Sequence, residues 1–136
     1  KGLDKELIFE CLTPTKIYVG PFLKVAERFK ILGAVHITGD AYLKFKKLIR
    51  NFGFGFFNFR PQPIFNLIQK TGKISLKEMF SVFNMGWGFA IVVGKEDADK
   101  ILNLLRREKI KAEIIGKVIK EKKIIINYQN KKIVLV

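Results

Sequence analysis

The 136-residue sequence is poor in the residues that build metal sites and catalytic triads. It has one cysteine, Cys11, and one histidine, His36. A lone cysteine allows no internal disulfide, and the two residues together make no Cys/His zinc cluster, so we predict no metal site and a reducing, cytoplasmic setting. A nucleophilic triad is also disfavoured, because Ser75 and Ser81 fall at the cap and in the interior of one expected helix.

Long apolar runs and secretion signals are missing as well. The longest uncharged apolar stretch, residues 52–59, is interrupted by two glycines and Asn58. A membrane-spanning helix needs about 20 apolar residues, so we predict no membrane association. Residues 1–10 lack the apolar core of a signal peptide. The sequence begins with Lys1 rather than methionine, and we expect that a further segment precedes it.

Acidic residues are few, with 12 Asp and Glu against 26 Lys and Arg, which gives a net charge of +14. Nucleic-acid binding would require these cations to gather on one face beside aromatic side chains. The lysines are instead dispersed over the polar faces of expected helices and over turns, and the phenylalanines of residues 52–59 suit a core strand better. We therefore predict a solvated basic surface of the kind typical of hyperthermophiles, and no nucleic-acid partner.

Periodicity and the positions of glycine and proline predict alternating helices and strands. The expected helices cover residues 21–31, 41–50, 63–70, 76–83 and 95–109, and the expected strands cover 34–37, 53–59, 89–93, 112–119, 124–128 and 133–136. Ser75 and Glu78 form a capping box before the fourth helix. The sum is a single domain, 1–136, of the mixed α/β (α+β) class, with helices covering a sheet.

His36 is the first candidate for a ligand site. It lies near the end of the expected strand 34–37 and is followed by Thr38, Gly39 and Asp40. Ligands of α/β sheets bind at the carboxyl ends of strands, and the amides at a helix start favour phosphate, so we predict that these four residues face a ligand. Two alternatives remain open: a packed histidine bonded to backbone, and an ordinary connecting turn.

Four short motifs follow one another along the chain. They are Pro-Thr-Lys-Ile-Tyr-Val-Gly-Pro at 14–21, His-Ile-Thr-Gly at 36–39, Pro-Ile-Phe with Leu-Ile-Gln at 63–69, and Glu-Met-Phe with Phe-Asn-Met-Gly-Trp-Gly at 78–88. In this order they resemble the carboxy-terminal half of the phosphoribosylaminoimidazole synthetase family, also called phosphoribosylformylglycinamidine cyclo-ligases. The likeness extends from about Thr13 to Val118. After Gly39, however, Asp-Ala-Tyr-Leu-Lys replaces the family's glycines and Leu-x-Glu-Asn.

The resemblance implies a ferredoxin-related carboxy-terminal domain of an enzyme, archaeal in origin. Such an enzyme uses ATP, with Mg²⁺, to cyclise formylglycinamidine ribonucleotide to aminoimidazole ribonucleotide. Most nucleotide contacts would belong to an amino-terminal domain that this chain lacks, so the chain alone would be inactive. The full-length enzyme is expected to be a homodimer. The alternative is a stand-alone binding or regulatory module of the same fold.

The resemblance also extends the list of candidate site residues. His36 would polarise, or exchange a proton with, the reacting amide. Asn84, Met85 and Gly86 would bind the substrate, through the asparagine amide and through close approach of the glycine backbone. The alternative for these three residues is a turn at the entry to a strand.

Overall fold

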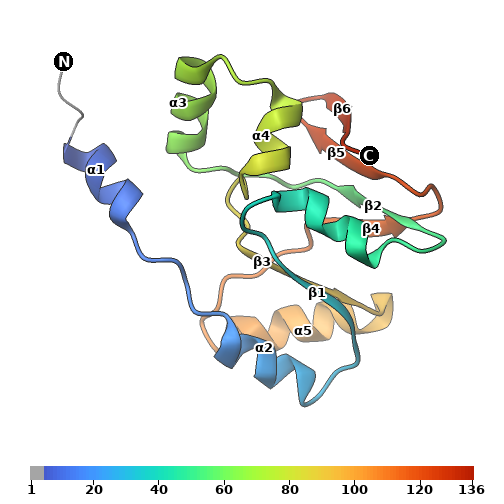
Figure 1. Ribbon diagram of the computed structural model, residues 1–136. Coiled ribbons are helices and arrows are strands. Elements are labelled where there is room, and N and C mark those ends of the chain that lie inside the picture. The colour runs from blue at the N-terminus through green and yellow to red at the C-terminus, as the bar shows by residue number, and fades with distance from the viewer. Residues whose placement is uncertain (1–4) are drawn as a thin grey trace.

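A computed structural model describes the backbone of residues 5–136 and the side chains of residues 9–136. The helices are α1 (Lys5–Leu12), α2 (Val19–Ala26), the 3₁₀ helix η1 (Ala41–Leu48), α3 (Pro63–Gly72), α4 (Leu76–Val82) and α5 (Lys95–Arg107). The strands are β1 (Ile31–His36), β2 (Gly53–Phe56), β3 (Phe89–Val93), β4 (Gly116–Ile119), β5 (Ile124–Tyr128) and β6 (Lys131–Val134). Helices pack on the sheets (Figure 1), so the predicted mixed α/β class is confirmed.

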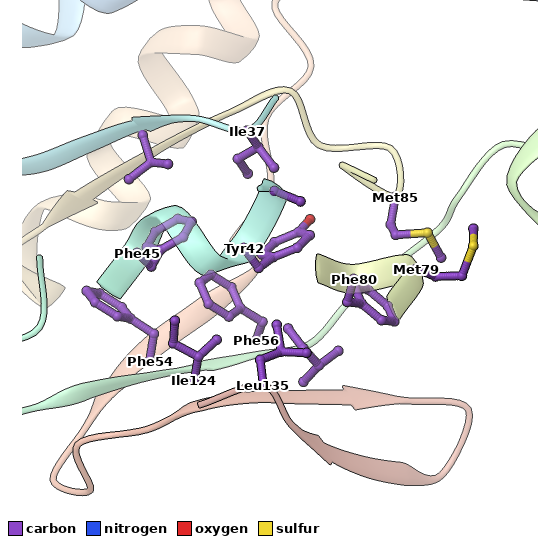
Figure 2. Packing of buried hydrophobic residues seen from close by; sticks show 13 residues of the cluster. Ile37, Tyr42, Phe45, Phe54, Phe56, Met79, Phe80, Met85, Ile124 and Leu135 are labelled. Carbon is purple, nitrogen blue, oxygen red and sulfur yellow. The ribbon is translucent and has the colours of Figure 1, made fainter. Parts of the chain in front are cut away.

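The larger sheet has the strand order β4-β2-β5-β6. Its central strand β2 pairs antiparallel with β4 and parallel with β5. Phe54 and Phe56 of β2 point toward η1 and α4, which cover one face of the sheet (Figure 2). Because β2 has a neighbour on each side and helices over that face, both rings are buried, as the core interpretation of this segment predicted.

The second sheet is an antiparallel ribbon of β1 and β3 that lies between two hydrophobic clusters. Val35 of β1 packs into the larger cluster, with η1, α4 and the four-stranded sheet. The smaller cluster forms on the other side around Val25 of α2 and around Ile101 and Leu105 of α5 (Figure 1). Most of the strand expected over residues 34–37 lies within β1, where Val35 is buried and His36 exposed because successive side chains of a strand point to opposite faces.

The segment expected to be an α-helix over residues 41–50 is instead the 3₁₀ helix η1. In a 3₁₀ helix, side chains three residues apart lie in line. Tyr42, Phe45 and Leu48 have this spacing, and all three pack against the larger cluster. The sequence therefore predicted the position of the helix correctly, whereas tertiary packing determines its type.

Three expected elements are longer than those observed by three residues or more. The strand expected over 53–59 ends at Phe56 as β2. The helix expected over 21–31 ends at Ala26, and Ile31 already belongs to β1, where it pairs with Val93. The strand expected over 112–119 is limited to β4, since its partner β2 offers only Gly53–Phe56 for pairing.

The carboxy-terminal hairpin differs from expectation in its turn. Gln129 and Asn130 have φ angles of 49° and 59°, which suit a tight hairpin turn. Lys131 and Lys132, which were expected in the turn, begin β6 and pair with the end of β5. The expected strand 133–136 is therefore shifted toward the amino terminus.

Helix α1, for which the sequence made no prediction, lies apart from the sheets (Figure 1).

Tyr42 connects η1 to the turn that follows α4. Its side chain is fully buried, and its hydroxyl donates a hydrogen bond of 2.8 Å to the carbonyl oxygen of Asn84. Its ring meets Phe56, Phe59 and Phe80 edge-on, with centroid separations between 5.1 and 5.8 Å. Burial raises the pKa of the phenol, because the apolar surroundings disfavour the phenolate.

Replacing Tyr42 by phenylalanine should lower the free energy of unfolding by about 1 kcal/mol, since the partly buried Asn84 carbonyl loses its donor. Urea denaturation at neutral pH measures this loss. The difference from the wild type should shrink above about pH 10, because the phenol then ionises in the unfolded chain but keeps its proton in the folded one. Tyr128→Phe is the matched control, since this hydroxyl bonds only an exposed glutamine. Equal losses in the two variants would contradict the assignment.

Candidate functional site

An open hollow of about 220 Å³ lies where the turn after β1 meets the end of α4. His36, Thr38 and Gly39 line it from the turn, and Asn84 lines it from the segment after α4. Four of the seven residues expected at a ligand site are thus brought together by the fold, although they are far apart in the sequence.

Each of the four sequence motifs contributes to this lining. Thr15 comes from the first motif, residues 36–39 form the second, Phe65 comes from the third and Gly88 from the fourth. The backbone N–H of Ile37 donates to the carbonyl oxygen of Gly88 over 2.8 Å and so ties the second motif to the fourth. Sequence reasoning missed Thr15 and Phe65 as site residues, and their membership of the motifs is the signal that could have found them.

The turn between β1 and η1 reverses the chain within a few residues. The N–H of Thr38 donates to the carbonyl oxygen of His36 over 3.0 Å, and the N–H of Ala41 donates to that of Thr38 over 2.6 Å. Asp40 has a φ of 64°, a left-handed conformation that aspartate tolerates better than most residues. Asp40 therefore stands where the chain reverses, and it does not belong to the lining of the hollow.

His36 is solvent-exposed and belongs to the lining of the hollow. Its ring lies edge-on to Tyr18, with the ring centroids 5.8 Å apart, and 6.3 Å from that of Phe89. A packed histidine would be buried and bonded to backbone, and this geometry does not match that alternative. His36 therefore combines solvent exposure with a place in the lining of the hollow.

The segment from Asn84 to Gly86 forms a tight turn between α4 and β3. The Asn84 Oδ1 atom accepts a hydrogen bond of 2.9 Å from the N–H of Gly86, which makes an Asx turn. Met85 is only 1% exposed, and Gly86 has a φ of 99°, which favours glycine. Met85 and Gly86 do not line the hollow, so their geometry fits the structural alternative. Asn84 does line it, and its Nδ2 group has no acceptor among the described residues.

Lys44 is a candidate that sequence reasoning missed. Its Nζ atom donates to the carbonyl oxygen of His36 over 3.1 Å and to the hydroxyl of Thr38. It ends the stretch in which the sequence departs from the family's pattern, so the motifs gave no guidance there.

Metal ligands do not gather in the part of the chain that the structure describes. No group of three or more His, Cys, Asp or Glu side chains there is arranged to hold a metal ion. Among the described helices, none is long and apolar enough to cross a bilayer.

Comparison with known proteins places the chain in a family. Residues 2–129 match the family model described as "AIR synthase related protein, C-terminal domain". The chain belongs to this family. The resemblance inferred from the four motifs is therefore confirmed.

Several relatives of this AIR synthase related chain are named phosphoribosylformylglycinamidine cyclo-ligase. The Methanococcus maripaludis protein is 37% identical over 142 residues, which cover 96% of this chain and 40% of that protein. The Caldicellulosiruptor bescii protein is 43% identical over 113 residues, which cover 79% of this chain and 33% of the relative. The Bacillus cytotoxicus protein is 40% identical over 122 residues, which cover 87% of this chain and 35% of that protein. The chain thus spans 40% or less of the length of these relatives.

A solved structure, T. maritima PurL complexed with ATP, shares the fold of this AIR synthase related domain. The TM-score is 0.61 at 18% sequence identity, and the match covers 85% of this chain and 19% of the PurL chain.

Two glycines of the AIR synthase motifs should respond differently to replacement by alanine. A Cβ atom added at Gly39 would meet no atom within 4 Å, so Gly39→Ala should change the free energy of unfolding by less than about 0.5 kcal/mol. At Gly86 the φ of 99° strains any other residue, so Gly86→Ala should cost about 1–3 kcal/mol. Urea denaturation of both variants checks the contrast. A large loss at Gly39 would show that the fold itself requires this glycine.

Proposed function

We propose that this chain is the carboxy-terminal domain of a phosphoribosylformylglycinamidine cyclo-ligase, which uses ATP to cyclise formylglycinamidine ribonucleotide to aminoimidazole ribonucleotide. The observation that carries the proposal is the convergence of all four motifs on one hollow. Family membership and the names of the relatives support the same function.

The chemistry of the proposed reaction balances without a redox step. Transfer of the terminal phosphoryl group of ATP to the formamide oxygen makes that oxygen a leaving group. The neighbouring nitrogen attacks the same carbon, the carbon–oxygen bond breaks, and phosphate departs. The attacking nitrogen loses a proton, and the products are aminoimidazole ribonucleotide, ADP and phosphate.

In this proposal the residues of the hollow orient the substrate and handle the proton. The imidazole of His36, an exposed residue of the lining, exchanges a proton with the reacting amide. Gly39 and Asn84 offer backbone N–H and amide donors to developing negative charge, and Thr38 offers its hydroxyl to the phosphate group of the substrate. Asp40, Met85 and Gly86 contribute through the two turns, since they set the positions of Gly39 and Asn84.

The described residues do not fit a magnesium site, because no acidic cluster is present among them. We therefore assign the metal and most nucleotide contacts to an amino-terminal domain, which is the proposed partner of this chain. We also propose that the enzyme formed by this chain and the amino-terminal domain is a homodimer.

A chimera tests the function. The part of the M. maripaludis cyclo-ligase that this chain matches, 40% of its length, is replaced by this chain. The purified chimera should form aminoimidazole ribonucleotide when ATP, Mg²⁺ and formylglycinamidine ribonucleotide are supplied. The unmodified relative is the positive control. A chimera that is folded but inactive would favour the alternative of a binding or regulatory module.

His36→Ala in the active chimera should lower kcat by about 100-fold or more, the range expected for a general acid or base. The melting temperature should hardly change, because the side chain is exposed. Turnover and thermal denaturation are measured on the same preparation. If both fall together, His36 has a packing role instead.

A further inference from the structure

Lys44 is not among the residues that line the hollow, but its ammonium group contacts two residues that are. Its Nζ atom lies 3.1 Å from the carbonyl oxygen of His36 and also donates to the Thr38 hydroxyl. Both of these residues line the hollow. The ammonium group is thus held by two of the residues that we propose to meet the substrate.

No carboxylate of the described residues neutralises this ammonium group. The two ion pairs between residues 9 and 136 are Lys24 with Glu108 and Lys100 with Asp97. The oxygens that hold Lys44 are a carbonyl and a hydroxyl, both uncharged. An ammonium group has three N–H donors, so one remains after these two contacts.

A purely structural role explains the arrangement poorly. The His36 carbonyl already accepts a hydrogen bond of 3.0 Å from the N–H of Thr38, so it does not need Lys44 as a donor. Ordering a long lysine side chain also costs rotamer entropy. Lys46 and Lys47 of the same helix are exposed, and neither makes a side-chain hydrogen bond within the described residues. The ordered Lys44 is therefore the exception on η1.

We propose that Lys44 binds a phosphate group of the ligand at this hollow. The Thr38 hydroxyl is the second donor, because it accepts from Lys44 and so keeps its own hydrogen for the anion. Hydrogen bonds from an ammonium group to an anion are charge-assisted and stronger than neutral ones. The inference rests on the proposed function in that it takes the hollow to be the substrate site.

The experiment is an NMR titration of the 136-residue chain with inorganic phosphate and, separately, with acetate, at constant ionic strength. Phosphate should shift the amide signals of Thr38 and Gly39 in a saturable way. Lys44→Gln should raise the phosphate dissociation constant at least about tenfold, the scale of one charge-assisted hydrogen bond. The matched control, Lys47→Gln, removes the same charge from the same helix and should change the phosphate dissociation constant less than about twofold. Phosphate should bind more tightly than acetate, and the reverse order would contradict a phosphate subsite.

Several results would overturn the inference. They are a wild-type chain that binds neither anion at Thr38 and Gly39, equal weakening in the two lysine variants, and no weakening in Lys44→Gln. If Lys44→Gln does not fold, Lys44→Arg and Thr38→Val replace it: the arginine variant should bind phosphate, and the valine variant should bind it at least several-fold more weakly. An arginine variant that does not bind phosphate, or a valine variant that binds it as tightly as the wild type, overturns the inference.

The chimera separates this inference from the proposed function. A folded, inactive chimera whose carboxy-terminal chain still binds phosphate through Lys44 would overturn the function alone. An active chimera in which Lys44→Gln leaves KM unchanged would overturn the role of Lys44 alone. The expected outcome is a raised KM with a smaller change in kcat, because binding an anionic group away from the reacting atoms acts on affinity first.

Discussion

The hydrogen bond from Tyr42 to the carbonyl oxygen of Asn84 joins the two sides of the candidate site. Tyr42 follows the turn that carries His36 and Gly39, and Asn84 begins the turn after α4. The Tyr42 ring is enclosed by aromatic side chains of the larger cluster, as Figure 2 shows for Phe45, Phe56 and Phe80. Since both turns are attached to this buried ring, the packing of the core sets their separation. The hollow is thus a consequence of the core rather than of contacts at the surface.

Local patterns in the sequence predicted which elements form, whereas their type and length depended on their neighbours. The capping box is present as expected, with the Ser75 hydroxyl accepting from the N–H of Glu78 over 3.2 Å. That interaction spans three residues and can be read from the sequence. The 3₁₀ form of η1 cannot, because it follows from the alignment of Tyr42, Phe45 and Leu48 with a sheet that is built by distant strands. The turn at Gln129 and Asn130 was misplaced for a related reason: the pairing of β5 with β6 sets its position.

In the candidate site too, the sequence predicted some residues, whereas the place of others depends on elements distant in the chain. The end of the expected strand 34–37 predicted His36, Thr38 and Gly39, the family resemblance added Asn84, and the structure brings these four together. Met85 belonged to the same motif, yet its side chain is buried, since a short turn cannot direct every side chain to one face. Lys44 could not be inferred, because its place depends on η1 bringing its ammonium group back to the strand end.

The net charge of +14 acquires a different meaning once individual lysines are compared. Lys46 and Lys47 are exposed on η1, and any basic surface would hold such residues. Lys44 differs in that neutral oxygens fix its ammonium group beside an exposed histidine. Packing does not explain the glycine at position 39 either, because a Cβ atom there would meet no atom within 4 Å. Packing and local strain account for Tyr42, Met85 and Gly86, but they do not account for the identities of His36, Gly39 and Lys44. His36 and Gly39 line the hollow, and Lys44 contacts two of its lining residues. Residues that the fold does not require, gathered around one hollow, are what a ligand site predicts.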